Sequence, residues 1–266
     1  MRWSDVPWPD LTRLADPPAG IHQVGLVPVG AIEQHGPHLP TGTDTMIAEA
    51  VCLEAGRRCG APVLPAIPVG CSYGHGTVLP GTLSLSPELL AAVVRSYAEW
   101  AAYSGLRRLL FVNAHLGNAA ALGVATDSLR LYRPDLRVGV VSWFDITAEV
   151  LGECTADGED IHANRAETSL MLAVAPHLVH LEHVADSDDE DRTGDLVFRY
   201  TAPALSRNGV TGRPSEATPE LGHRLLDLIV TALVDRVERG RREEPPLGVA
   251  PVPAPPAPTP GPAPLA

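Results

Sequence analysis

Four side chains that commonly bind metal ions follow a short apolar stretch near the N-terminus. Residues 24–44, VGLVPVGAIEQHGPHLPTGTD, contain Glu33, His35, His38 and Asp44. Residues two apart in an extended chain point to the same side, so Glu33 and His35 should project together. A carboxylate beside an imidazole suits Zn²⁺, Mn²⁺ or Fe²⁺. An isolated pair of this kind is more often a surface loop, and Asp44 could simply cap the helical pattern that follows.

The elements that would carry these side chains alternate between strand and helix. Apolar, β-branched runs predict buried strands over 23–31, 62–69, 107–112 and 136–141. Helical patterns cover 45–59, 87–103, 119–131, 166–175 and 219–239. This alternation predicts an α/β fold, with a mostly parallel sheet flanked by helices on both faces. Sites in such sheets lie at the carboxyl ends of the strands, where Glu33, His35, His75, His115 and Asp145 are expected.

Three further residues strengthen the metal hypothesis. His115 follows the strand RRLLFV on a Gly/Asn-rich loop, and His162 and Glu167 lie in DIHANRAETS just before a helix. Each has an ordinary explanation: a hydrogen bond within a turn, an exposed loop, or an acid favoured at a helix N-terminus. Together they are less ordinary, because the same residue types gather at three separate junctions between strands and helices.

Four motifs resemble the creatininase (creatinine amidohydrolase) family. They are VPVGAIEQHGPHLPTGTD, SYGHGTVLPGTLSL, FVNAHLGN and DIHANRAETS, and the resemblance covers about residues 20–240. It implies an α/β/α sandwich, a two-metal site, hydrolysis of a non-standard amide and frequently a hexamer. Carried over by motif, the resemblance makes Glu33, His35, Asp44 and His115 metal ligands, with Asp44 bridging the two ions. It places His162 near the scissile amide.

The sequence also departs from creatininase itself. A further metal-binding glutamate of creatininase is replaced by Gly117, and a creatinine-contacting tryptophan by a residue near Gly158. We expect Glu167 to fill the missing coordination position. His75 lies one residue farther from the LPGT segment than the motif predicts. We assign substrate-binding roles to Ser72, His75, Trp143 and Asp160.

The expected chemistry follows from such a site. Two divalent ions (Zn, Mn or Fe) joined by a carboxylate can share a hydroxide nucleophile, which attacks the amide carbon. One ion can stabilise the oxyanion, and His162 is the expected proton donor to the leaving nitrogen. His162 and Glu167 are therefore the predicted catalytic residues. The substrate stays open between a small cyclic or linear amide and a peptide-derived amide. A creatininase-like peptidase that trims a modified precursor peptide, of the mycofactocin type, is an alternative.

Two other classes of protein remain possible. Gly70-Cys71-Ser72-Tyr73-Gly74 fits G-x-S-x-G, the nucleophile elbow of serine hydrolases, but no helix is expected before Ser86. The elbow requires a helix directly after the serine, so this hypothesis is weaker. The second alternative is a non-catalytic, metal-stabilised scaffold.

Composition limits partners and location. The 266 residues carry a net charge of −12 without a basic cluster, which argues against a nucleic-acid ligand. We expect no membrane span and no signal peptide, because the apolar runs are too short. The four cysteines form no C-x-x-C pair and predict reduced thiols in a cytoplasmic protein. We predict a single domain over 1–243, a solvated acidic loop over 182–195, and a disordered Pro/Ala-rich tail over 244–266.

Overall fold

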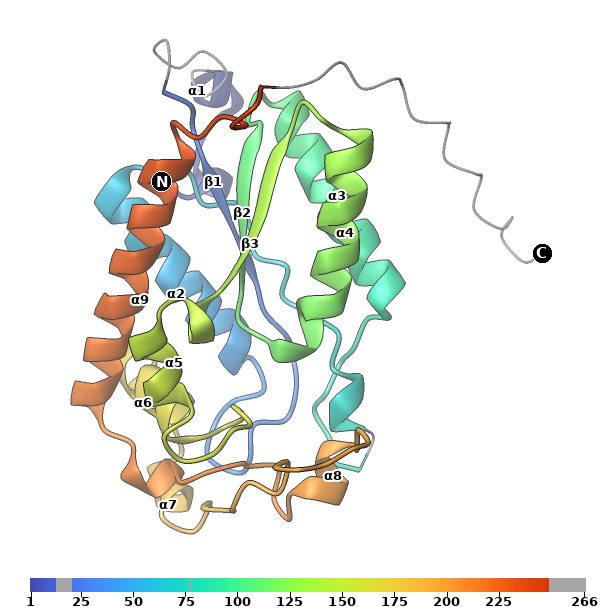
Figure 1. Ribbon diagram of the computed structural model, residues 1–266. Coiled ribbons are helices and arrows are strands. Elements are labelled where there is room, and N and C mark those ends of the chain that lie inside the picture. Colours follow the sequence, from blue (N-terminus) through green and yellow to red (C-terminus); the bar gives the residue numbers. More distant parts are fainter. Residues whose placement is uncertain (13–20, 77, 249–266) are drawn as a thin grey trace.

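A three-stranded parallel sheet forms the centre of the computed structural model, which describes residues 1–12, 21–76 and 78–248. The strands are β1 (Gly25–Val29), β2 (Arg108–Asn113) and β3 (Arg137–Ser142), and they lie in that order. Gly25 pairs with Leu109, and Arg108 pairs with Arg137. All strands therefore run the same way, and their carboxyl ends meet at one edge of the sheet, at the lower end of Figure 1.

Helices cover both faces of this sheet (Figure 1). On one face α2 (Thr43–Cys59), α6 (Arg165–Val174) and α9 (Pro219–Gly240) pack with Leu26 and Val112. On the other, α3 (Pro87–Tyr103) and α4 (Ala119–Tyr132) pack with Val27 and Phe111. Side chains alternate between faces along a strand, so the apolar β1 and β2 can build two cores. The predicted α/β fold is confirmed.

The shorter elements lie mainly at the carboxyl end of the sheet. These helices are α5 (Ala148–Cys154), α7 (Leu181–Val184) and α8 (Ala202–Leu205), while α1 (Trp8–Leu11) lies near the N-terminus. Single 3₁₀ turns cover Trp3–Asp5, Tyr73–His75, Leu116–Asn118, Trp143–Asp145, Pro176–Leu178 and Pro214–Glu216. Among the residues that the structure describes, none of the helices combines the length and apolar character needed to cross a bilayer.

The strand expected over 62–69 is wrong as a continuous strand. The segment does run beside β1, because Val63 bridges to Leu26 and Ile67 bridges to Val29. Its backbone accepts a hydrogen bond at Pro62 and donates from Leu64. The prolines of this segment have no N–H to donate, so the ladder is interrupted.

The acidic run over 182–195 is more ordered than the predicted solvated loop. Its first residues belong to α7, and Asp189 is buried. Asp189 Oδ2 accepts hydrogen bonds from the Arg207 backbone and the Ser206 hydroxyl. Asp191 Oδ2 accepts from the backbone of Glu159 and of Asp160. The prediction fails at Asp189 and Asp191, whose carboxylates accept hydrogen bonds from neighbouring loops, whereas Asp186, Asp188, Glu190 and Asp195 are exposed as predicted.

The structure describes the predicted C-terminal boundary of the domain, but only the first residues of the predicted tail. Glu244 forms an ion pair with the buried Arg108, at 2.6 Å, so packing extends one residue beyond the predicted boundary at 243. Residues 249–266, most of the predicted tail, lie outside the described residues. All four cysteines are free thiols, as predicted.

Candidate functional site

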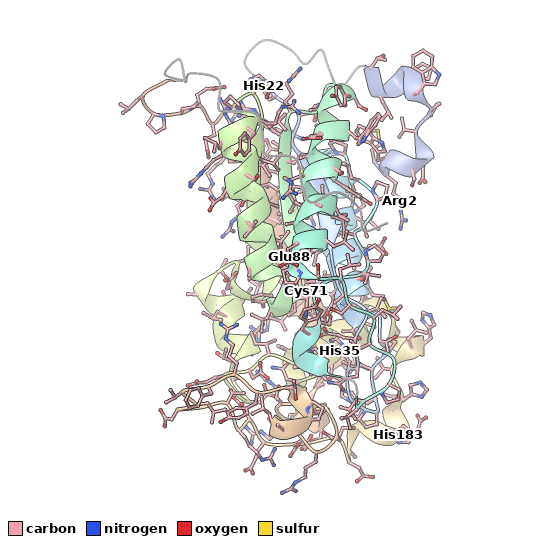
Figure 2. All side chains as sticks on the ribbon, turned by 90° about the vertical axis from the view of Figure 1, so that its right-hand side faces the viewer. Arg2, His22, His35, Cys71, Glu88 and His183 are labelled. Atoms are coloured by element: carbon pink, nitrogen blue, oxygen red, sulfur yellow. The ribbon has the colours of Figure 1, made fainter. Side chains whose placement is uncertain are left out.

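A cavity of about 220 Å³ lies at the carboxyl ends of β1 and β2. Figure 2 shows the end of the sheet concerned: His22, which precedes β1, lies near one end of the molecule, and Cys71 and His35, which follow β1, lie toward the other end. Ionisable side chains that line the cavity are Glu33, Asp44, His75, His115, Asp160, His162 and Glu167. His35 lies behind Asp44 and Glu167 and contacts both.

Separate elements bring these side chains together. Glu33 and His35 follow β1, while Asp44 stands in the first turn of α2. The N-cap of α2 is Gly42, so the alternative role of Asp44 as a helix cap does not apply. Glu167 lies in the first turn of α6, after the N-cap Asn164.

A network of amide side chains holds the loop of His115. Asn113 Oδ1 accepts from the His115 backbone N–H and from Asn118 Nδ2. Asn118 in turn donates to the Gly30 carbonyl and accepts from the Cys71 backbone. The Asn-Ala-His and Leu-Gly-Asn residues after β2 thus tie β1, β2 and the Cys71 loop into one support for His115.

Asp44 lies between two sets of ligand-type side chains. Its Oδ1 is 3.2 Å from His35 Nε2, and its Oδ2 is 3.5 Å from His115 Nδ1. On the His35 side, Glu167 Oε2 lies 3.9 Å from His35 Nε2. On the His115 side, Glu33 Oε1 lies 3.2 Å from His115 Nδ1. The two oxygens of one carboxylate therefore face two different imidazoles.

Hydrogen bonds on the far side of each ring orient these two histidines. His35 Nδ1 lies 3.2 Å from the Glu33 carbonyl, and His115 Nε2 lies 3.1 Å from the Cys71 carbonyl. A carbonyl only accepts, so those nitrogens carry protons. The other nitrogen of each ring, which faces the carboxylates, is the one that a metal ion would take.

Burial and close carboxylates change the proton affinities of the cluster. Burial opposes charge on His35, but Asp44 and Glu167 outweigh it and raise the pKa of His35 to about 10. Burial likewise opposes charge on His115, yet Glu33 raises its pKa to about 9. Burial raises the pKa of Glu167 to about 8. These pKa values favour protonated His35 and His115 rings beside the carboxylates when no metal is bound.

Other members of the cluster shift in different directions. Burial, with His35 and His75 nearby, lowers the pKa of His162 well below its usual range. Burial raises the pKa of Asp44. Glu33 keeps a low pKa, because hydrogen bonds from His115 and His75 outweigh its burial.

Three buried polar atoms of the cluster have no hydrogen-bond partner: Glu33 Oε2, His35 Nε2 and Asp44 Oδ2. His35 Nε2 is close to Asp44 but is not directed as a hydrogen bond. Unpaired buried groups of this kind are costly. Each of these atoms is a possible metal ligand, and His35, Asp44 and Glu167 offer ligand atoms within 4.8 Å of one another. The residues therefore fit a divalent ion bound by nitrogen and oxygen.

Gly117, the position where the motif resemblance expects an additional glutamate, has no room for a side chain. A Cβ at this position would lie 2.3 Å from the Cys71 carbonyl oxygen and 2.4 Å from His115 Nε2. The backbone conformation here leaves no space for a side chain, so the structure offers no ligand from position 117.

The predicted substrate-binding residues fall into two groups. His75 and Asp160 line the cavity. Ser72 and Trp143 do not line it: Ser72 is 2% exposed and Trp143 is completely buried. Phe144 lines the cavity in place of Trp143. A pattern of residue types could not tell which of two adjacent aromatic side chains in this 3₁₀ turn reaches the cavity, because the two rings also contact each other, with centroids 5.8 Å apart.

Asp145, expected at the site, and His38, a histidine of the first motif, do not line the cavity. Asp145, at the end of β3, does not line it and is exposed. His38, on the first motif, turns its Nε2 toward Thr168 Oγ1 at 2.8 Å. Sequence reasoning missed Gln34, Tyr200 and Thr211; Gln34 had a signal, because it stands between Glu33 and His35.

The comparison with protein families identifies the architecture. The family described as Creatininase: Creatinine amidohydrolase matches residues 4–237. The chain belongs to the creatininase family. Because this family is described as amidohydrolases, the chain is an amidohydrolase by membership of the family.

Creatininase relatives of two kinds resemble the whole domain. The mycofactocin precursor peptide peptidase of Mycolicibacterium smegmatis is 34% identical, over 80% of this chain and 84% of the relative. The creatinine amidohydrolase of Pseudomonas putida is 32% identical, over 83% and 90% respectively. The solved structure titled "Creatininase Mn" has a TM-score of 0.75 at 28% identity, covering 91% of this chain and 99% of that one.

The resemblance drawn from the four motifs is thereby confirmed. A mutant creatininase described as Zn-Zn type has a TM-score of 0.76 at 28% identity, and covers 91% of this chain and 98% of that one. Solved creatininase structures are thus described with zinc in one case and with manganese in another. Together with the clustered carboxylates and imidazoles, they support divalent metal binding by this chain.

Proposed function

We propose that this creatininase-family protein hydrolyses a non-standard amide with two divalent ions, held on either side of Asp44. His35, Asp44 and Glu167 would hold one ion, and Glu33, Asp44 and His115 the other. The observation that carries this proposal is that the two oxygens of Asp44 face His35 and His115 separately. Zn, Mn and Fe all suit such ligands.

The chain's own residues supply binding and proton transfer. Bound divalent ions lower the pKa of water and polarise an amide carbonyl. His162 lines the cavity beside Glu33, with its Nδ1 3.6 Å from Glu33 Oε1. From there it can pass a proton to the leaving nitrogen. Phe144 and Leu116 form part of the apolar wall, which excludes water from the reacting amide.

Glycines at two positions argue against creatinine as the substrate. A Cβ at Gly158, near the place of the creatinine-contacting tryptophan, would lie 2.9 Å from Asp191 Cβ. Gly117 is equally restricted. Both positions that the resemblance associates with creatinine are therefore closed to larger side chains in this backbone.

An exposed apolar strip favours a peptide-derived amide. The strip comprises Leu196, Val197, Phe198 and Tyr200, of which Val197 is 88% exposed and Phe198 is 71% exposed. It reaches the cavity, because Tyr200 also lines it. A large apolar surface at a cavity mouth fits a substrate longer than a small ring. Similar relatives named as precursor peptide peptidases agree with this.

The serine-hydrolase alternative has no support in the described residues. Ser72 Oγ is buried without a hydrogen-bond partner, so no general base activates it there. A chelator should therefore abolish hydrolysis, and Ser72→Ala should retain it.

The test is a substrate panel with purified, metal-loaded protein. It should contain creatinine, small formamides and peptides with apolar C-terminal residues, assayed before and after chelation and after return of Zn²⁺ or Mn²⁺. Asp44→Asn should lose both ions and all hydrolysis. Asp127→Asn, on the exposed face of α4, is the matched control and should change neither. Active protein without metal would refute the proposal, and bound metal without any hydrolysis would favour the scaffold alternative.

We also propose a homo-oligomeric assembly and a cytoplasmic location for this protein. The resemblance implies a homo-oligomer, and light scattering of the full chain would test for a hexamer. The free thiols agree with the expected reducing cytoplasm, which localisation in cells would test.

A further inference from the structure

The amide of Gln34 has one orientation because backbone groups hold both of its ends. Its Oε1 accepts from the Gly36 backbone N–H at 3.0 Å, and its Nε2 donates to the Gly209 carbonyl at 3.1 Å. A reversed amide would place its oxygen against a carbonyl and its NH₂ group against an N–H. The identity of each atom therefore follows from its surroundings.

This oriented nitrogen also faces two imidazole rings. Gln34 Nε2 lies 2.8 Å from His162 Nε2 and 3.1 Å from His75 Nδ1. An amide nitrogen donates hydrogen bonds and does not accept them. The NH₂ group has two hydrogens to share among the Gly209 carbonyl and these two ring nitrogens, and a protonated ring nitrogen at these distances would oppose it. Both ring nitrogens are therefore unprotonated, and the protons of the neutral rings lie at His162 Nδ1 and His75 Nε2.

We propose that Gln34 is a positioning residue that sets the tautomers of His75 and His162, so that both rings present N–H groups to the cavity and neither binds metal. The arrangement is the reverse of that at His35 and His115. Behind those two rings stands a carbonyl, which accepts from the rear nitrogen, so the front nitrogen is the one where a metal ion can replace a proton. Behind His75 and His162 stands a donor.

With this tautomer, His75 orients Glu33 and is not a metal ligand. Glu33, His75 and His115 offer ligand atoms within 4.8 Å of one another, so proximity alone would allow His75 as a ligand. A protonated Nε2 has no lone pair for a metal. Instead it donates to Glu33 Oε1 at 3.1 Å and orients that carboxylate.

The same tautomer suits the task of His162, a step that rests on the proposed function. Its ring lies between His35 and His75, with centroids 4.5 Å from each. With Nε2 held by Gln34, the proton at Nδ1 is the one available to a leaving nitrogen in the cavity.

Gly209 provides the space that Gln34 needs. It has a positive φ of 84°, and a Cβ there would lie 1.9 Å from Gln34 Oε1. Any side chain at position 209 would displace the amide. Gly209→Ala is therefore a second way to remove Gln34 from the rings without changing a polar residue.

The test uses the full-length, zinc-loaded protein with ¹⁵N-labelled histidine. Ring ¹H–¹⁵N correlations distinguish the two tautomers, and His75→Gln and His162→Gln assign the signals. We expect Nε2–H at His75 and Nδ1–H at His162. In Gln34→Met both should become mixtures, and kcat should fall at least about tenfold, since general acid catalysis contributes roughly 10²–10⁴. Zinc content and KM should stay within about twofold of wild type, because no ligand is lost.

Gly209→Ala should change both tautomers in the same way as Gln34→Met. Gly123→Ala, on α4 with open space around its Cβ position, is the matched control and should change neither. Zinc bound to His75 Nε2 in the wild type, or unchanged tautomers in Gln34→Met, would overturn the proposal; so would loss of zinc from Gln34→Met. The expected tautomers in a protein that hydrolyses no amide would uphold the role of Gln34 and refute only the proposed function.

Discussion

Glu167→Gln tests whether this buried acid is a metal ligand. In the metal-free protein, burial raises the pKa of Glu167 to about 8, so near neutral pH its carboxyl group is mostly protonated. Glutamine closely matches a neutral carboxyl in shape, and its oxygen can keep the hydrogen bond from Ala163 N–H, which is 2.6 Å long. We therefore expect the metal-free variant to lose no more than about 1 kcal/mol of stability.

The metal-loaded variant should behave differently. Loss of even a group that only supports a ligand weakens metal binding by ~10–100-fold. That range corresponds to about 1.4–2.7 kcal/mol less stabilisation by bound metal. For a domain of this size, the metal-induced rise in Tm should then shrink by roughly 3–11 °C. Because Glu33, Asp44 and His115 remain, the ion on the Glu33 side should be retained.

The assay compares thermal unfolding in chelator and in excess Zn²⁺, with elemental analysis of the same samples. Asp127→Asn serves as the control, since this exposed acid on α4 pairs with Arg130 and does not line the cavity. If Glu167 merely favours the N-terminus of α6, its replacement costs only ~0.3–1 kcal/mol with or without metal. A Glu167→Gln protein with two ions and wild-type turnover would refute the ligand role.

Three further outcomes are expected. Zinc should displace the protons that His35 and His115 hold, with pKa values of about 10 and about 9. Zinc affinity should therefore rise with pH until the pH exceeds these pKa values. Calorimetry in two buffers would measure the proton release, and an affinity that does not change with pH would contradict this prediction. Gly117→Ala should displace the His115 ring and cost about 1–3 kcal/mol, and elemental analysis should show less metal; a fully loaded, equally stable variant would show that the backbone adapts. Ending the chain at Gly248 should leave Tm unchanged, whereas removing Glu244 as well should lower Tm, because the buried Arg108 loses the side-chain carboxylate it pairs with, although it keeps its hydrogen bond to the Gly240 carbonyl. Equal Tm values for the two truncations would contradict this.

The sequence was sufficient to bring the ligands to one place, and the reason is topological. Glu33 and His115 follow different parallel strands, and the carboxyl ends of such strands must meet. The Asp44 and Glu167 carboxylates lie in first helical turns, which begin from the same edge. Alternation of strand and helix therefore implied proximity without any knowledge of distances.

What the sequence could not give is the direction of individual side chains. Trp143 and Phe144 are adjacent, yet only Phe144 reaches the cavity. The acidic run around Asp189 has the composition of a solvated loop, and only tertiary hydrogen bonds from Ser206 and Arg207 show its structural role. Segment 62–69 has strand-like residues, but the absence of N–H groups on its prolines outweighed their propensity.

The cluster of carboxylates and imidazoles at the cavity destabilises the fold unless it binds an ion or a ligand. Three carboxylates and four imidazoles share one buried site, and Glu33 Oε2, His35 Nε2 and Asp44 Oδ2 have no partner there. Hydrophobic residues of similar size would pack there at less cost, so stability alone gives no reason for these groups. The hydrogen bonds behind the rings divide the histidines further, since carbonyls behind His35 and His115 free a nitrogen for metal, while Gln34 prevents this at His75 and His162. The group behind each imidazole thus determines which ring nitrogen faces the cavity, and this separates the two rings that can bind metal from the two that can donate protons.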